Sequence, residues 1–443
     1  MRKLLFLALI AAVACKPAEV NPPVDNPEET PENTPEKTVE EVPAEYASYT
    51  RVPLNSVLHG VQPMTGIVLW TGQSKGPEGY ISMEFSYMLY SDVCKEKDVY
   101  DWTVVDKLLD QVAANGHQAI MRFRYTYPGK KCAVPDYIKA WPGYEETEGK
   151  ADGGHRTWFP DWRCEELQRF HMEFYRLFAE RYDNDPRIAF LETGFGLWAE
   201  YHIYDGPFIL GKTFPSKEFQ AEFISNMPKW FKNTPWLISI DAADNTYSPF
   251  RKQPELLEVD FGNFDDSFMC EDHDGYNRRS WLFFGQDRYQ KSPEGGEFSY
   301  YSTYDQRHCL DTAGMYGRRF EDEVARYHLS FIIGADQPSY QKWPRIIEAS
   351  QSMGYRYRIK DFRVKAGTGA AVWVKNAGVA PIYYDAFLDV DGVRSSYNLR
   401  GLMPGDSLWV DINNPAVKDT PVLSIACDRL VPGQKIEYEA DIQ

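Results

Sequence analysis

The sequence lacks several patterns that would place it in a common class of protein. None of its seven cysteines forms a Cys-x-x-Cys pair or a His/Cys cluster with zinc-site spacing. Its 48 lysines and arginines are outnumbered by 65 aspartates and glutamates, so the basic footprint that neutralises nucleic-acid phosphates is missing. Beyond the first fifteen residues, no apolar run approaches the roughly 20 residues that span a bilayer. These absences argue against zinc-finger, nucleic-acid-binding and membrane-spanning proteins.

The first fifteen residues have the composition of an export signal. Arg2 and Lys3 precede an apolar run from Leu4 to Val13, and small residues then lead into Cys15. The run is too short for a transmembrane helix, and its charge and small-residue exit are typical of a secretory signal. The segment ending in Cys15 resembles the lipobox of bacterial lipoproteins, in which the cysteine carries the lipid. We therefore predict a lipid-anchored cell-envelope protein at the outer membrane, periplasmic or surface-exposed; the alternative is an ordinary signal peptide.

Composition divides the rest of the 443-residue chain. Residues 16–48 are rich in Pro, Glu and Thr, and such a segment buries too little apolar surface to offset the entropy of ordering. We expect a disordered spacer there. After the signal (1–15) and this spacer, we predict a barrel domain over residues 49–352 and a β-sandwich over residues 353–443.

Six cysteines follow Cys15, namely Cys94, Cys132, Cys164, Cys270, Cys309 and Cys427. In an exported protein some can pair, and six cysteines allow fifteen connectivities. We expect one or two structural disulfides in preference to a metal site, and we predict no metal ion and no cofactor.

Short β-type runs alternate with helical patterns from about Asn55 to Ala349, as they do in βα units. The predicted strands are 66–70, 81–89, 118–125, 187–193, 236–241, 259–264, the stretch before Gly295, and 327–332. Eight such units match a (β/α)8 TIM barrel, an α/β fold. A doubly wound open sheet is the alternative, but no Gly-rich phosphate-binding loop follows the first strand.

After Gly354 the hydrophobic pattern changes to alternation between apolar and polar residues. The alternating runs are 371–374, 382–390, 407–412 and 422–426, and Gly, Asn and Pro turns join them. This pattern predicts a small C-terminal all-β sandwich. We interpret it as a packing and spacing domain. A sugar-binding role is the alternative, although only Trp373 and Trp409 could serve as stacking tryptophans.

The first candidate catalytic residue follows the fourth predicted strand. In a TIM barrel the working side chains lie at the C-terminal ends of the strands. Glu200 lies there, close in sequence to Trp198, Tyr201 and His202. Aromatic neighbours can stack on a sugar face and can raise a carboxyl pKa toward the range of a general acid. We select Glu200 as acid/base, with Glu192 as a competitor because it is closer to the strand.

The second candidate, Glu297, follows Gly295-Gly296 at the end of the seventh strand. Carboxylates after strands four and seven would face each other across the barrel mouth, as in retaining glycosidases. There one carboxyl protonates the leaving oxygen while the other attacks the anomeric carbon across about 5–5.5 Å. We therefore assign Glu297 as nucleophile; a separation of roughly 6.5–9.5 Å would indicate inversion.

Polar and aromatic residues at other strand ends are predicted to bind substrate, because sugar hydroxyls need many paired donors and acceptors. They are Arg122, Tyr125, Trp198, His202, Asp241, Asp266 and His328.

Several short motifs resemble a family of uncharacterised bacterial lipoproteins. They are Gly194–His202, Arg122–Tyr125, Phe264–Phe268, Gly295–Glu297 and the segment from Trp343-Pro344 to Arg356. The resemblance covers most of the chain after Asn55, and it implies a barrel similar to clan A glycoside hydrolases followed by a small β-sandwich. The chain departs from this pattern before Glu200, where Ala199 replaces the glycine of the family and the asparagine of clan A enzymes.

The predicted function is a retaining glycoside hydrolase that acts on a polysaccharide or host glycan at the cell envelope. The rival, from another class, is a surface lipoprotein that binds glycan without cleaving it, since fold alone does not settle function. A purely structural envelope protein is a third possibility, which an aromatic-poor barrel mouth would favour. The expected partners are a carbohydrate and the membrane, the latter through the lipid anchor only, and we expect no binding of nucleic acid.

Overall fold

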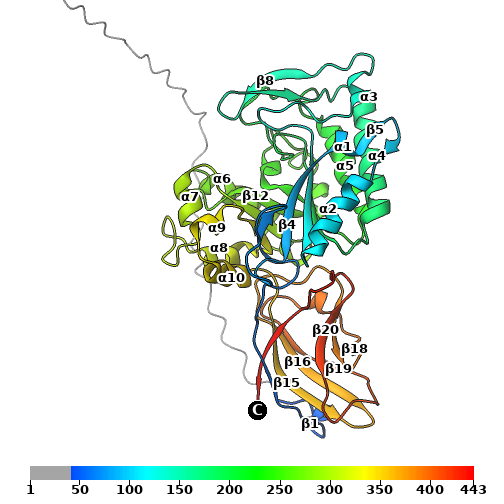
Figure 1. Cartoon of the computed structure of the whole chain (residues 1–443), viewed down its shortest axis with the longest axis vertical. Helices are drawn as coiled ribbons and strands as arrows, with labels where there is room; N and C mark the ends of the chain where they lie inside the picture. The colour runs from blue at the N-terminus through cyan, green and yellow to red at the C-terminus, as the bar shows by residue number, and fades with distance from the viewer. Residues whose placement is uncertain (1–40) are drawn as a thin grey trace, which may run out of the picture. The chain divides into compact units, whose positions relative to one another are not determined.

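The computed structural model describes residues 41–443, and Ser48–Gln443 form one compact unit (Figure 1). The predicted signal, Cys15 and residues 16–40 of the predicted spacer lie outside the described residues. Within the described range, no helix combines the length and the apolar character that crossing a membrane requires.

Eight parallel strands close into a barrel in which each strand pairs with the next one of the set in the chain, and the last pairs with the first. The strands are β3 (Gly66–Trp70), β4 (Met83–Leu89), β7 (Gln118–Arg124), β10 (Ile188–Glu192), β11 (Trp236–Ser239), β12 (Gly262–Phe268), β13 (Glu294–Phe298) and β14 (Phe331–Ile333). The predicted TIM barrel is confirmed.

Helices cover the outside of the barrel (Figure 1). The longer ones are α2 (Thr103–Ala114), α4 (Glu165–Tyr182), α5 (Lys217–Trp230), α6 (Asp274–Phe284), α8 (Phe320–Tyr327) and α10 (Trp343–Gln351). In α4, Phe170, Phe174 and Phe178 recur every fourth residue and are buried against the barrel. Burial of each such ring contributes about 1.5–3 kcal/mol, which fixes the helix on the strands.

Alternation along the strands separates the inside of the barrel from the layer under the helices. On β7, Ile120 lies in the cluster inside the barrel, whereas Met121 and Phe123 belong to the cluster that packs on the helices. Arg122 shares the inward face with Ile120, because successive side chains of a strand point to opposite sides. The barrel therefore directs one buried cation to its interior.

The sixth strand lies further along the chain than predicted. It was expected at 259–264, but β12 spans Gly262–Phe268 and includes Asp265 and Asp266. Gly, Asn and Asp are depleted from strands, so the polar end of β12 gave no strand signal. The glycine pair before Glu297 also lies inside a strand, β13, where a side chain on Gly295 would strike the ring of Phe331.

The C-terminal module consists of two antiparallel-rich sheets. The larger contains β19 (Ser407–Ile412), β16 (Gly369–Asn376), β15 (Tyr357–Lys365), β21 (Tyr438–Ile442), β2 (Leu54–Ser56) and β1 (Thr50–Arg51). The smaller contains β18 (Val393–Arg394), β17 (Ala386–Val390) and β20 (Leu423–Cys427). The boundary at residue 49 needs correction, because β1 and β2 pair with β15 and β21 of the module (Figure 1).

The sandwich is attached to the N-terminal end of the barrel. The Tyr384 hydroxyl donates to the Ala189 carbonyl at the start of β10 (2.5 Å), and the Tyr383 hydroxyl donates to the Tyr289 carbonyl (2.7 Å). One hydrophobic cluster runs from Phe190 and Phe331 inside the barrel to residues of the sandwich. This end is therefore closed, and the opposite, C-terminal end stays open.

The cysteine prediction is wrong for the described part of the chain. All six cysteines after Cys15 are free thiols, and four of them are buried. Burial raises the pKa of Cys94 and Cys132 to about 12. These thiols pack as small apolar groups, a common role for free cysteine.

Candidate active site

A cavity of about 970 Å³ opens at the C-terminal end of the barrel. Its aromatic lining is Trp70, Tyr87, Tyr127, Trp198, Tyr204, Tyr276, Tyr300 and Tyr301. Its carboxyl lining is Asp152, Glu200, Asp205, Asp241, Asp266, Asp272, Glu297 and Asp336. A cavity of this size, with aromatic walls and convergent polar groups, fits a small-molecule or glycan site.

Arg122 lies fully buried beneath the cavity and connects two glutamates. Its Nε donates to Glu192 Oε2 (2.8 Å), its Nη2 pairs with the same oxygen (2.6 Å), and its Nη1 donates to Glu200 Oε1 (2.6 Å). The guanidinium also lies over the Phe264 ring, 4.3 Å from its centroid. Glu192 serves as the counter-ion of Arg122 and does not line the cavity, so it does not compete with Glu200 for the proposed acid role.

The loop after β10 explains the glycine-rich motif around Glu200. A side chain on Gly194 would lie 2.2 Å from the Ala199 carbonyl oxygen, and one on Gly196 would lie 1.9 Å from that of His202. The loop folds back so tightly that only glycine fits at both positions. Trp198 (φ 54°) and Ala199 (φ 60°) adopt left-handed backbone conformations, which present Glu200 to the cavity. Ala199 thus occupies a position that favours glycine.

His202 links two carboxylates on the cavity floor. Its Nε2 lies 3.0 Å from Glu200 Oε2 and 3.5 Å from Asp266 Oδ2. Although burial disfavours the charged imidazolium, Asp266 and Glu200 raise the pKa of His202 to about 10. The hydrogen bond and charge of His202 in turn hold the pKa of Asp266 well below its usual range, against the effect of burial. His202 and Asp266 therefore form an ion pair at neutral pH.

Four ligand-type atoms, from Glu200, His202, Asp241 and Asp266, lie within 4.8 Å of one another. A metal-ligating histidine usually donates a hydrogen bond from its other ring nitrogen, which fixes the tautomer. Here the group next to the other nitrogen, Nδ1, is the Tyr204 amide at 3.5 Å, which is a donor and cannot accept a hydrogen bond from the ring. The proton on Nε2 points to the carboxylates of Glu200 and Asp266. This arrangement favours a histidine–carboxylate network over a metal ion.

The two proposed catalytic carboxyls are both hard to ionise. Burial raises the pKa of Glu200 well above its usual value, and the neighbouring charge of Asp266 adds to this. Burial also raises the pKa of Glu297 to about 8, although the positive charge of Arg122 opposes the shift. Among the described residues, no hydrogen bond or ion pair to the Glu297 carboxyl is found. Glu297 is therefore the freer of the two groups to react with a ligand.

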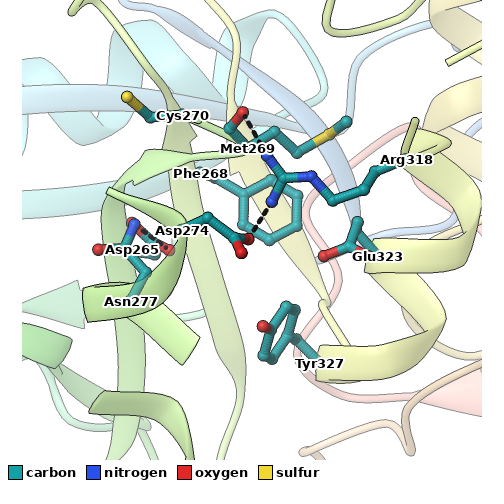
Figure 2. A pocket seen from close by; sticks show the side chains of 9 residues that line it. All are labelled: Asp265, Phe268, Met269, Cys270, Asp274, Asn277, Arg318, Glu323 and Tyr327. Carbon is teal, nitrogen blue, oxygen red and sulfur yellow. Dashed lines mark hydrogen bonds and ion pairs between the residues drawn. The ribbon is translucent and has the colours of Figure 1, made fainter. Parts of the chain in front are cut away.

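The two adjacent aspartates of β12 point into different environments. Asp266 lines the large cavity. Asp265 points the other way and accepts hydrogen bonds from Asn277 Nδ2 (2.9 and 3.0 Å) and Trp281 Nε1 (3.3 Å). Asp265 is one of the residues that line a separate space of about 10 Å³. Figure 2 shows Asp265 and Asn277 on one side of this space and Arg318 and Glu323 on the other. That space holds at most one water molecule, so it offers no room for a substrate.

Five of the seven predicted substrate-binding residues belong to the site: Trp198, His202, Asp241 and Asp266 line the cavity, and Arg122 lies below it. The prediction that Tyr125 binds substrate is wrong. Its hydroxyl is hydrogen-bonded to His171 Nδ1 (3.0 Å) and its ring stacks on Tyr90, in the layer between strands and helices. As the third residue after Arg122, it points to the opposite side of the strand.

The prediction that His328 binds substrate is also wrong. It caps the C-terminus of α8 in a left-handed conformation and precedes β14, so it lies at the closed end of the barrel. Its ring stacks on Tyr289 at 3.5 Å, and its Nδ1 lies 2.6 Å from the Val379 carbonyl of the sandwich. The residue joins the two domains instead of binding ligand.

Several lining residues were missed. Tyr87 lies on the predicted second strand with Phe85 on the same face, so period-two alternation could have identified it. Tyr204 and Tyr276 come from a loop and a helix that meet only in the folded protein; their hydroxyls are 2.7 Å apart, and Tyr204 donates to Asp241 Oδ1. Nothing in the sequence signals that contact.

Solved structures similar to this chain share little sequence with it. The catalytic domain of β-amylase from Paenibacillus polymyxa is 10% identical with a TM-score of 0.38, over 62% of this chain and 92% of that one. A mutant xylanase A of P. fluorescens subsp. cellulosa with xylopentaose is 9% identical (TM-score 0.38; 66% and 98%). Endo-glycoceramidase II from Rhodococcus sp. is 8% identical (0.36; 83% and 99%). The chain matches no protein-family model, and no curated protein is significantly similar to it.

Proposed function

We propose that the protein is a retaining glycoside hydrolase that acts on a polysaccharide or host glycan at the bacterial cell envelope. The observation that carries the proposal is the pair of carboxyls, the buried Glu200 after β10 and the half-buried Glu297 at the end of β13, which line one aromatic cavity. Retaining glycoside cleavage requires stacking surfaces, one carboxyl whose raised pKa keeps it protonated as the acid, and a second carboxyl that reacts as the ionised nucleophile.

In this mechanism the leaving-group oxygen approaches Glu200, which is protonated because it is buried next to Asp266. Arg122 holds Oε1 in place, while Oε2 is the oxygen on the side of the cavity-lining His202. Glu200 gives its proton to the leaving oxygen as Glu297 attacks the anomeric carbon. Water then enters, Glu200 removes its proton, and the glycosyl–Glu297 ester is hydrolysed. Trp198 and Tyr87 supply ring faces for the sugar.

The experiment separates folding, binding and turnover. The chain without its first 46 residues is screened for released sugar against a glycan panel, and the best substrate is tested on Glu297→Gln and Glu200→Gln. Each variant is expected to lose about 10³-fold in kcat while still unfolding in one cooperative thermal transition. Glu222→Gln, which makes the same change on an exposed residue of α5 that does not line the cavity, is the control. Undiminished turnover by Glu297→Gln would refute the assignment, and the anomer released first distinguishes retention from inversion.

Glycan binding without cleavage is the second candidate, and one observation favours it. Both oxygens of Glu200 already have partners, Arg122 and His202, so a leaving oxygen must displace the histidine contact. If the displacement fails, the cavity holds sugar without breaking it. Micromolar binding of a glycan that is recovered intact would establish this function.

The proposed location rests on the sequence alone. Cys15 would carry the lipid, and residues 16–48 would hold the barrel away from the outer membrane. Replacement by Cys15→Ser should release the protein from the membrane fraction, because acyl chains rather than a transmembrane helix would provide the anchor.

A further inference from the structure

The cavity carries a strong excess of acidic groups. Eight carboxyls line it, and among the described lining residues none is a lysine or an arginine. The cations close to its floor are His202, which is shared between Glu200 and Asp266, and Arg122, which Glu192 and Glu200 already hold. The other lining histidine, His273, is hydrogen-bonded to the Ser267 hydroxyl (2.9 Å). The acidic groups therefore outnumber the cations that could neutralise them.

One acceptor on the floor has no partner. Asp241 is 2% exposed; its Oδ1 accepts a hydrogen bond from the Tyr204 hydroxyl, whereas its Oδ2 has none among the described residues. A buried carboxylate oxygen without a donor costs roughly 1–3 kcal/mol or more, so such an atom is commonly completed by a ligand. Asp241 and Asp266 offer oxygens within 4.8 Å of each other, close enough for one small cation to contact both.

On this basis, and resting on the proposed function, we infer that the sugar bound beside Glu200 carries a free, protonated amino group held by Asp241 and Asp266. An ammonium group presents three N–H donors, which match the free Oδ2 of Asp241 and the Asp266 carboxylate. An N-acetyl group loses the charge, and a uronate or sulfate brings a second negative charge next to Asp266. The cavity should therefore select amino sugars and exclude anionic glycans.

The test measures binding independently of hydrolysis. Dissociation constants are determined for glucosamine and galactosamine, their N-acetyl forms, the parent hexoses and the matching uronic acids, with ligand-observed NMR on the chain without its first 46 residues. Each amino sugar is expected to bind about 10- to 100-fold more tightly than its parent hexose, the range for a charge-assisted hydrogen bond. The uronic acids are expected not to bind.

Two variants locate the effect. Asp241→Asn keeps the shape of the side chain and should remove the amino-sugar preference. Asp419→Asn makes the same charge change on an exposed residue of the sandwich, remote from the cavity, and should keep it. Equal affinity for amino sugars and hexoses would overturn the inference, and so would a preference that survives in Asp241→Asn.

Other outcomes are also decisive. Stoichiometric Mn²⁺ or Zn²⁺ binding that Asp241→Asn abolishes would assign the four-residue cluster to a metal and overturn the ammonium assignment. Hydrolysis of a neutral glycan by the wild-type protein, with no amino-sugar preference, would refute this inference while leaving the proposed function intact. Amino-sugar binding without turnover on any glycan would do the reverse.

Discussion

The two ends of the barrel solve the same packing problem in opposite ways. At the N-terminal end, the Tyr384 hydroxyl of the sandwich donates to a strand carbonyl, and one apolar cluster continues into the second domain. At the C-terminal end, eight carboxyls crowd a cavity, and several of them have raised pKa values because they are buried near one another. The first arrangement favours stability. The second arrangement lowers stability, and clustered groups with strongly perturbed pKa values are typical of a functional site.

The largest expected effect comes from the ion pairs beneath the cavity. Arg122→Met should destabilise the protein by about 3–5 kcal/mol, because it leaves Glu192 buried without a counter-ion. Chemical denaturation measures the loss. The double variant Arg122→Met/Glu192→Leu, which removes both charges, should recover most of it. A single variant as stable as wild type would show that the open end is not held together by charge.

The pH profile sharpens the role of Glu297. Since burial raises its pKa to about 8, a nucleophilic Glu297 is mostly protonated at pH 6, and kcat/KM should rise about tenfold per pH unit up to that value. A profile that instead falls through pH 8 would make Glu297 the proton donor and reverse the two roles.

The same shift predicts how stability depends on pH. The folded state holds the Glu297 proton more tightly than the unfolded chain, in which the pKa of the carboxyl has its ordinary value of 4.5. This contribution is complete below about pH 4.5 and is lost as the pH rises through 8. The thermal midpoint of Glu297→Gln should therefore gain on that of wild type between pH 5 and 8, and parallel curves would contradict the shift.

The closed end should respond more mildly. Tyr384→Phe removes one hydroxyl and leaves the Ala189 carbonyl without that donor, which costs about 1 kcal/mol. Turnover should not change, because the contact lies at the opposite end from the cavity. A loss of activity at unchanged stability would show that the sandwich acts on the site.

The smallest effect is expected at the loop that presents Glu200. Ala199 has a left-handed backbone (φ 60°), so Ala199→Gly relieves strain but adds freedom to the unfolded chain. The two terms nearly cancel, and stability should rise by no more than about 1 kcal/mol. A substantial drop would mean that the methyl group of Ala199, which is 1% exposed, contributes more packing than the backbone strain costs.

Most of the fold could be predicted from periodicity. The strand at 66–70 was predicted with the bounds that the structure has, because a short apolar run is typical of a buried strand. The predicted bounds of β12 were wrong because the strand ends with Asp265 and Asp266 instead of apolar residues. Asp266 lines the cavity, and Asp265 accepts hydrogen bonds outside it. Local propensity gives no signal for such residues.

The candidate site was predictable only in part. Glu200, Glu297, Asp241 and Asp266 could be selected because carboxyls at strand ends face the open end of a barrel. The predictions for Tyr125 and His328 were wrong for two reasons. The side of the strand to which Tyr125 points depends on the exact register, and His328 adjoins the N-terminal end of a strand instead of the C-terminal end. A shift by one residue moves a side chain to the other face.

The sequence by itself determined the barrel, the sandwich and the places where carboxyls follow strands, since these depend on patterns local to each segment. Only the tertiary structure decided which groups meet: Arg122 with Glu192 and Glu200, His202 with Asp266, and Tyr204 with Asp241. These partners lie far apart in the chain, and their meeting depends on the conformation of loops. Their pKa values depend on being buried together. Charge pairing inside a cavity is a property of distances, which no local pattern encodes.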